Sequence, residues 1–300
     1  MTTDLDKGLA SLAESVRLST VQVRAQRHGG GSGVVWSADG AIITNAHVVG
    51  SARDVWIESP DGRTIRGAVT LRDDRLDLAE ITPISEAGSL RSATIGRAGA
   101  LRVGDVVAAL GAPLGIAGTL TLGIVHRATS DRLGVTRRWL EADLRLAPGN
   151  SGGPMVDALG RVVGINSMIA GGLALAVPSE TADRFVRTRG VRAWLGVTTQ
   201  PVAVHNAVER GANVRSIEAT LGLIVVELAP GAPAELAGLS LGDVIVRAGG
   251  ESIDRPDALG FALDRMVPGD PIVVEALRGK KLRSISIVTG RLTAQVDRAA

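Results

Sequence analysis

The chain of 300 residues is long enough for about two domains with buried cores. It contains no cysteine, which excludes disulfides and thiolate metal sites. Its formal net charge of +2 comes from basic residues interspersed with acidic ones, which gives nucleic-acid binding only weak support. No stretch approaches the roughly 20 apolar residues of a membrane span, and tyrosine is absent, so the cores must be filled mainly with Val, Ile, Leu and Ala.

The N-terminal residues predict a short amphipathic helix within residues 1–17. Its apolar residues recur at helical spacing, at Leu5, Leu9, Leu12 and Val16. The first seven residues lack the basic region and the apolar run of a signal peptide. We therefore expect a cytoplasmic location, or an extracytoplasmic one if the N-terminus has been trimmed.

Residues 18–100 contain short β-branched runs separated by turn clusters, and a second set of such runs covers residues 101–178. This pattern predicts antiparallel β structure at hairpin spacing. In the first set, the run Ile42–Val49 predicts a strand that leads into His47. Further on, Asp77 stands in an apolar segment, where a carboxylate is costly without a partner.

The second set contains the run APGNSGGP, in which Ser151 stands between glycines. Such a cluster by itself is more often a plain turn. A serine becomes a good nucleophile when a histidine takes its proton, and that histidine needs a carboxylate to fix its tautomer and stabilise the imidazolium. The sequence therefore predicts a triad of His47, Asp77 and Ser151, with the N–H groups of Gly149 and Ser151 as the oxyanion hole.

The motifs TNAHVV, DLA and GNSGGP, in this order, resemble the HtrA/Deg family of chymotrypsin-like serine proteases, and the match runs through residues 18–290. The resemblance implies a mainly β fold, in which residues 18–190 form two six-stranded barrels that meet at a cleft. His47 and Asp77 would come from the first barrel and Ser151 from the second. No metal-ligand spacing and no P-loop motif is present, so we expect neither a cofactor nor a requirement for ATP.

The resemblance also assigns residues around the triad. Ser167 matches the position where such enzymes place a hydroxyl against the triad carboxylate, and the substrate pocket falls at Asn166, Met168 and Leu173. No acidic residue lies in the pocket segments, so we expect cleavage after small or medium aliphatic residues; a peptide library cut mainly after basic residues would contradict this. Glu80, where the family usually has an apolar residue, should face away from Asp77.

Ser179 is expected to start a helix that ends near Gly190 and closes the protease domain. Residues 193–293 resemble the HtrA-type PDZ domain, a small α+β sandwich in which an extended peptide adds as a strand. The resemblance places a carboxylate-binding loop at Trp194, Leu195, Gly196 and Val197, and a peptide groove beside a helix at 254–266. The apolar side chains on one face of that helix, Leu259, Ala262, Leu263 and Met266, could equally line the peptide groove or belong to the core of the domain. A final hairpin is predicted to pair 272–278 with 282–288.

Two functions follow from these features. The first is an ATP-independent serine endopeptidase that cleaves unfolded or damaged proteins, with a PDZ domain that binds peptide C-termini or regulates activity. The second is a catalytically silent, chaperone-like peptide-binding module. Family members often form homotrimers through N-terminal segments, so the helix within residues 1–17 is a candidate contact; its other role is packing on the protease body.

Overall fold

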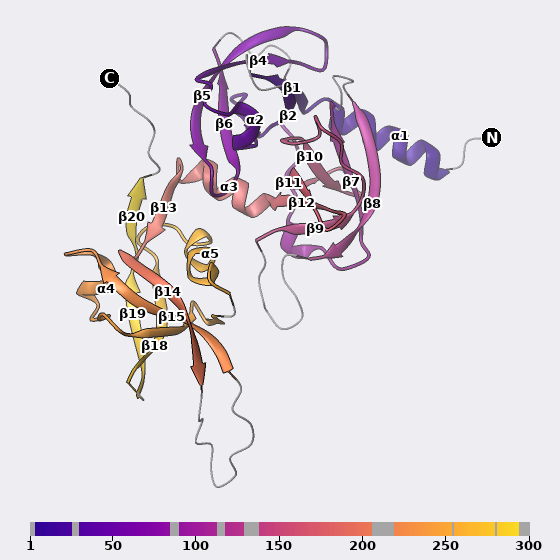
Figure 1. Cartoon of the computed structure of the whole chain (residues 1–300). Coiled ribbons are helices and arrows are strands. Elements are labelled where there is room, and N and C mark those ends of the chain that lie inside the picture. Colours follow the sequence, from indigo (N-terminus) through magenta and orange to yellow (C-terminus); the bar gives the residue numbers. More distant parts are fainter. Residues whose placement is uncertain are drawn as a thin grey trace. The chain divides into compact units, whose positions relative to one another are not determined.

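The computed structural model describes residues 4–25, 30–84, 90–112, 118–128, 138–205, 219–253, 255–279 and 281–293. The chain divides into two compact units, one that ends at Gly190 and one that begins at Val191. Figure 1 labels the helices and strands of both units. In the part of the chain that the structure describes, no helix is long and apolar enough to cross a bilayer.

Within its described residues, the first unit contains two closed antiparallel barrels of six strands each (Figure 1). The first barrel runs β1-β2-β3-β6-β5-β4 and consists of β1 (Thr20–Arg24), β2 (Gly30–Val35), β3 (Ile42–Thr44), β4 (Asp54–Glu58), β5 (Thr64–Asp73) and β6 (Leu78–Pro83). The second repeats this order and consists of β7 (Val106–Gly111), β8 (Thr119–Arg127), β9 (Leu140–Asp143), β10 (Pro154–Asp157), β11 (Val162–Ala170) and β12 (Leu173–Pro178). A 3₁₀ turn, η1 (Ala98–Ala100), lies between them in sequence. The predicted mainly β fold with two barrels is confirmed.

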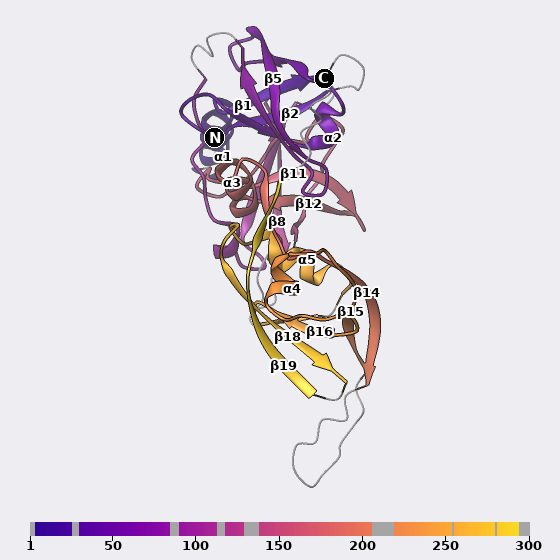
Figure 2. The same ribbon diagram turned by 90° about the vertical axis from the view of Figure 1, so that its left-hand side faces the viewer.

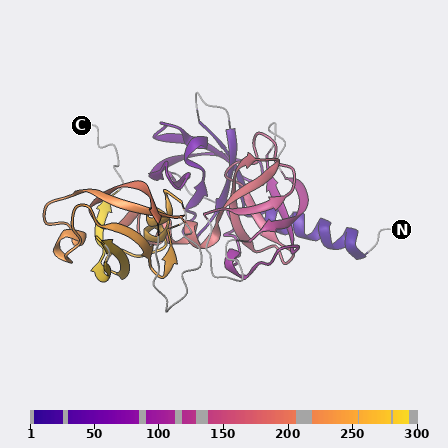
Figure 3. The ribbon, with the colours of Figure 1, turned by 60° about the horizontal axis from the view of Figure 1, so that its bottom comes forward.

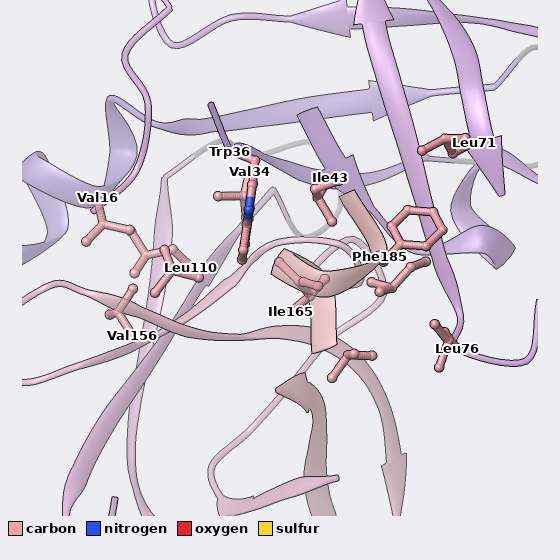
Figure 4. Close-up of a cluster of buried hydrophobic side chains, with 14 of the residues drawn as sticks. Val16, Val34, Trp36, Ile43, Leu71, Leu76, Leu110, Val156, Ile165 and Phe185 are labelled. Carbon is pink, nitrogen blue, oxygen red and sulfur yellow. The ribbon is translucent and has the colours of Figure 1, made fainter. Parts of the chain in front are cut away.

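Successive side chains of strand β7 point alternately into the second barrel and toward the core that the two barrels share. Val107 and Ala109 belong to the interior of the second barrel, whereas Ala108 and Leu110 face a separate cluster. Figure 4 shows that this cluster draws side chains from both barrels, among them Val34, Trp36, Ile43, Val156 and Ile165. Val, Ile, Leu and Ala fill most of these clusters, as the composition predicts.

The strand predicted over Ile42–Val49 is shorter than expected. Strand β3 ends at Thr44, and Ala46–Val49 form a single helical turn, α2. The turn buries Val48 and Val49 in the interior of the first barrel and leaves His47 exposed. A β-branched run alone cannot distinguish these conformations, because both bury valine.

Helix α1 (Asp4–Arg17) packs on the barrels only through its C-terminal end. Val16 is buried and Leu12 is partly buried in the cluster between the barrels, whereas Leu5 is 68% exposed. Figure 3 shows the helix extending away from the barrels. At the other end of this unit, helix α3 (Ser179–Arg187) buries Ala182 and Phe185 in the same cluster.

Glu80 of β6 is buried and forms contacts of its own. Its Oε1 accepts hydrogen bonds from the Thr70 hydroxyl at 2.8 Å and from the Arg189 guanidinium at 2.9 Å. Arg189 follows α3 and has a positive φ of 52°. Because it pairs with Glu80, it connects the end of the first unit to β6. The carboxylate that stands at a usually apolar position is therefore satisfied by residues distant in sequence.

The second unit is a curled antiparallel sheet with short helices beside it (Figure 2). The described strands are β13 (Val191–Trp194), β14 (Val197–His205), β15 (Ala219–Leu228), β16 (Val244–Ala248), β17 (Glu251–Ser252), β18 (Pro271–Arg278), β19 (Lys281–Val288) and β20 (Gly290–Thr293). The main sheet runs β14-β15-β16-β18-β19, β17 pairs with β16, and β13 pairs with β20. Strand β14 is thus an edge strand among the described residues. The helices are α4 (Pro233–Leu236) and α5 (Ala258–Asp264).

The C-terminal hairpin is confirmed, with Ile272 opposite Ile287, although Lys280 in its turn lies outside the described residues. Helix α5 is shorter than the predicted 254–266, and residue 254 is also outside them. Leu259 and Ala262 of its stripe are buried in the core of this unit. The core interpretation therefore accounts for these two residues.

Asp243 and Arg278 form an ion pair in the second unit. The guanidinium donates from Nε and Nη2, each at 2.7 Å, to the two carboxylate oxygens, and the carboxylate is only 1% exposed. Its Oδ2 also accepts the N–H of Ser240 at 2.9 Å. The hydrogen bond from Arg278 outweighs the opposite effect of burial and holds the pKa of Asp243 below its ordinary value of 3.8.

We expect Asp243→Asn to lower the free energy of unfolding of the second unit by about 1–3 kcal/mol at about pH 7, because an amide accepts one of the two bonds and turns its NH₂ toward the other donor. Since the folded-state pKa is lowered, the carboxylate stabilises fully above the unfolded value of about 3.9, and this is lost as the pH falls through the folded value. Hydrogen exchange of β15 and β18 in urea should show the difference from wild type shrinking toward about pH 3.

The matched control is Asp257→Asn, which removes an exposed carboxylate that pairs with Arg255. It should change the stability by less than about 0.5 kcal/mol. Equal losses in the two variants would contradict the importance of the buried pair.

Candidate active site

His47 and Asp77 of the first barrel face each other. The Nδ1 of His47 lies 2.9 Å from each carboxylate oxygen of Asp77, and the backbone N–H of His47 donates to Oδ1 at 3.2 Å. The imidazole is 49% exposed, whereas the carboxylate is 13% exposed. The carboxylate can therefore fix the ring and its tautomer, while Nε2 is left for a second partner.

Asp77 is held from three sides. The Ser167 hydroxyl donates to its Oδ2 at 2.5 Å, and the side-chain amide of Asn45 donates to its backbone carbonyl at 2.8 Å. Its φ is +55°, a conformation that Asp adopts more readily than most residues and that is characteristic of functional sites. The family resemblance points to Ser167, whereas Asn45 lies within the motif TNAHVV and was given no role there.

Two opposing effects set the charge of Asp77. Burial raises the pKa of the carboxyl, but hydrogen bonds from His47 and Ser167, together with the charge of His47, lower it by more. The net pKa lies below the ordinary 3.8, so the group is a carboxylate at neutral pH.

Ser151 of the second barrel lies in the turn that precedes β10. Its hydroxyl donates to the backbone carbonyl of Ser167 at 3.0 Å, on the strand that also supplies the hydroxyl to Asp77. Within the described residues, no hydrogen bond joins Ser151 to His47. The hydroxyl must therefore turn away from the Ser167 carbonyl before the imidazole can take its proton.

The turn before Ser151 offers a pair of backbone donors. Gly149 has a φ of +108°, which favours glycine, and the N–H of Asn150 closes the turn onto the carbonyl of Ala147 at 2.9 Å. Neither the N–H of Gly149 nor that of Ser151 donates to an acceptor among the described residues. Both donors are available to an incoming oxygen, as an oxyanion hole requires.

The three pocket residues differ in how they lie. Met168 is exposed and Leu173 partly exposed, but Asn166 is fully buried, and its amide donates to the carbonyl of Pro154 at 3.0 Å. The side chain of Asn166 is thus directed into the barrel. The assignment of Asn166 to the pocket needs correction, because its backbone is engaged as well: its N–H donates to the carbonyl of Gly153 at 2.9 Å, and its carbonyl accepts the N–H of Gly152 at 2.8 Å.

In the second unit, the loop from Trp194 to Val197 directs its carbonyl groups into the fold. The carbonyl of Leu195 accepts the N–H of Ala234 at 2.9 Å, and that of Gly196 accepts the N–H of Ala229 at 2.8 Å. Gly196 has a φ of +79°, and a Cβ there would lie 2.2 Å from that of Ala232 and 3.1 Å from the Trp194 ring. The loop therefore requires glycine at this position and leads directly into the edge strand β14.

Among the described residues, no group of three or more His, Asp or Glu side chains could hold a metal ion. The polar groups on this part of the chain are of the kinds that acyl transfer uses: a hydroxyl, an imidazole paired with a carboxylate, and two backbone N–H groups.

The model of the trypsin-like peptidase domain matches residues 31–165, and that of the PDZ domain matches residues 195–289. A putative serine protease HhoA of Synechocystis sp. is 33% identical over 280 residues, which cover 88% of this chain and 71% of the relative. A solved structure of an HtrA-type protease AlgW with tripeptide superposes with a TM-score of 0.71 at 27% identity, covering 95% of this chain and 97% of that chain.

The chain belongs to the HtrA family of serine proteases. Another HtrA relative, a probable periplasmic serine endoprotease DegP-like of Halomonas elongata, is 34% identical over 285 residues. This match covers 88% of the chain and 57% of the relative, so the chain spans little more than half the length of that protein.

The names of these HtrA relatives correct the expected cytoplasmic location. The proteins from Halomonas elongata and Chlamydia muridarum are both named periplasmic endoproteases. The expectation was wrong because it rested on the composition of seven residues, which cannot establish a compartment.

Proposed function

We propose that this chain is an ATP-independent serine endopeptidase that cleaves unfolded or damaged polypeptides outside the cytoplasm. The observation that carries the proposal is the position of Ser167, whose carbonyl accepts the Ser151 hydroxyl and whose hydroxyl donates to Asp77, the partner of His47. The N–H groups of Gly149 and Ser151, which have no acceptor among the described residues, support it. The names of the relatives, which include serine endoproteases, agree with it. We further propose assembly as a homotrimer, in which the exposed part of α1 takes part.

In the proposed reaction, the hydroxyl of Ser151 turns from the Ser167 carbonyl toward His47 and attacks the scissile carbonyl as the imidazole takes its proton. The negative charge that develops on the carbonyl oxygen is stabilised by the N–H groups of Gly149 and Ser151. Asp77 offsets the charge of the imidazolium, which then protonates the leaving amine. A water molecule then attacks the acyl carbonyl while the imidazole takes its proton, and the imidazolium returns a proton to Ser151 as the acid product leaves.

The test is labelling by a fluorophosphonate, together with digestion of casein, in the wild type and in Ser151→Ala. Label and digestion in the wild type alone would support the proposal. If the wild type neither labels nor cuts but still binds unfolded chains, the chaperone-like alternative is correct.

We propose that the PDZ domain binds peptide C-termini as a strand added to β14, with the carboxylate held by N–H groups of the loop from Trp194 to Val197. Two observations support this: the carbonyls of Leu195 and Gly196 are engaged inside the fold, and β14 is a sheet edge. The HtrA-type protease AlgW, which has the same fold, was solved with a tripeptide.

This proposal predicts that C-terminal amidation weakens peptide binding to Ser151→Ala by about tenfold or more, because a charge-assisted bond is replaced by a neutral one. Fluorescence anisotropy of matched peptides, with a free or an amidated end, measures the ratio. Equal affinities would show that the loop does not read the carboxylate.

A further inference from the structure

Ser32 of β2 is a fully buried polar residue whose contacts lead to the turn that holds Ser151. Its backbone N–H donates to the carbonyl of Ser151 at 2.7 Å, and its hydroxyl donates to the carbonyl of Gly149 at 2.7 Å. The residue therefore holds the carbonyl groups of both residues whose N–H groups form the proposed oxyanion hole.

The direction of the hydroxyl is determined by its other partner. The N–H of Ala112, just after β7, donates to the Ser32 oxygen at 2.9 Å, so the hydroxyl proton is free to point to Gly149. The carbonyl of Ser32 in turn accepts the Thr44 hydroxyl at 2.7 Å. Each polar group of Ser32 thus has a partner, and these partners come from both barrels.

Three glycines allow the neighbouring backbone to approach Ser32 closely. A Cβ at Gly152 would lie 2.1 Å from the Ser32 carbonyl oxygen, and a Cβ at Gly111 would lie 3.0 Å from the Ser32 hydroxyl oxygen. A Cβ at Gly153 would lie 3.0 Å from that of Ser32. The close approach fixes the distance between β2 and the turn, and it permits only a small side chain at position 32.

We propose that Ser32 is a positioning residue for the oxyanion hole; this inference rests on the proposed proteolytic function. The peptide between Gly149 and Asn150 lies between the two proposed donors, and Ser32 holds its carbonyl. Without that bond, the hydrogen bond from the N–H of Asn150 to the carbonyl of Ala147 is left to hold this peptide among the described residues, and glycine at 149 lets the peptide rotate. A displacement of about 1 Å at a catalytic group can cost about 10²-fold in rate.

The test is Ser32→Ala, which removes one oxygen atom and leaves the backbone bond to Ser151. We expect kcat on a peptide substrate to fall about 10²-fold with KM within about twofold. Affinity for a peptide boronate, whose oxygen occupies the oxyanion hole, should fall in parallel, while affinity for the product peptide is unchanged. The matched control is Ser19→Ala, which removes another buried hydroxyl, bonded to the carbonyl of Val16, and should retain wild-type kinetics.

Three results would overturn the inference. The first is a kcat equal to that of Ser19→Ala, and the second is a loss shared equally by boronate and product peptide, which marks a general loosening. If Ser32→Ala does not fold, the test uses Ser32→Cys, whose thiol is a weak hydrogen-bond donor. A wild-type kcat in Ser32→Cys is the third result that would overturn the inference. Before these variants are compared, the wild type is shown to cleave the peptide and Ser151→Ala is shown not to. A wild type that does not cleave would refute the proposed proteolytic function, and this outcome is distinct from failure of the inference about Ser32.

Discussion

Replacing Ser151 by alanine should lower kcat for peptide hydrolysis by about 10⁶-fold, the largest effect expected from a single substitution in this chain. The alanine leaves His47, Asp77 and both N–H donors in place but removes the atom that forms the acyl bond. The residual rate, about 10³-fold over water, would come from the remaining donors and from substrate binding. Single-turnover cleavage of a peptide with a fluorogenic leaving group measures the ratio.

The fold should be unaffected by this change, because the hydroxyl is partly exposed and donates a single hydrogen bond, to the carbonyl of Ser167. Unfolding of Ser151→Ala in urea is therefore the control, with an expected change below about 1 kcal/mol. A decrease in kcat of less than about 10³-fold without loss of stability would show that another residue supplies the nucleophile.

Asp77→Asn should lower kcat by about 10⁴-fold, the second largest effect among the variants proposed for this chain. The amide has no charge to offset the imidazolium, and it can turn its NH₂ toward His47 and favour the wrong tautomer. Ser167, which donates to Oδ2 in the native site, would favour the amide oxygen on its own side and so direct the NH₂ to the imidazole. KM should change little, because Asp77 does not contact the substrate.

The matched control is Asp74→Asn, the same chemical change at an exposed residue of the same turn that pairs with Arg72. It should retain wild-type kcat. The two variants should also differ in how they respond to pH. Asp74→Asn keeps the Asp77 carboxylate, whose lowered pKa leaves it charged until the pH falls below 3.8, whereas Asp77→Asn lacks this charge at every pH. A wild-type kcat in Asp77→Asn would remove Asp77 from the mechanism.

The hydrogen bond from Ser151 to the Ser167 carbonyl bears on both predictions. A hydroxyl that donates to a carbonyl is not yet activated, and the imidazole can take its proton only after the hydroxyl has left that carbonyl. Since Ser167 also donates to Asp77, strand β11 contacts the nucleophile and the carboxylate at once. A substrate that pairs with the backbone of β11 would act on both.

Individual residues show how far prediction from the sequence extends. The chemistry of His47, Asp77 and Ser151 was predicted from three short motifs taken together, because each motif alone is more often structural and only their combination and order resemble a serine protease. The strands are visible as β-branched runs, since alternation along a strand is a local property, whereas their closure into two barrels was implied by the resemblance to the HtrA/Deg family. The predicted strand over Ile42–Val49 failed at Thr44, because valine buries equally well from a strand and from a helical turn.

Residue types and their local period predicted β structure, a core of aliphatic residues and three candidate catalytic groups, and the resemblance to the HtrA/Deg family added the two barrels and the PDZ domain. Only the tertiary structure showed that Ser32 holds Gly149, a residue 117 positions away, that Asn45 holds Asp77, and that the Asn166 side chain is turned inward. A buried serine on one strand has the same local pattern whatever it contacts. Which carbonyl it meets is decided by closure of the two barrels, where packing brings distant segments within hydrogen-bond distance.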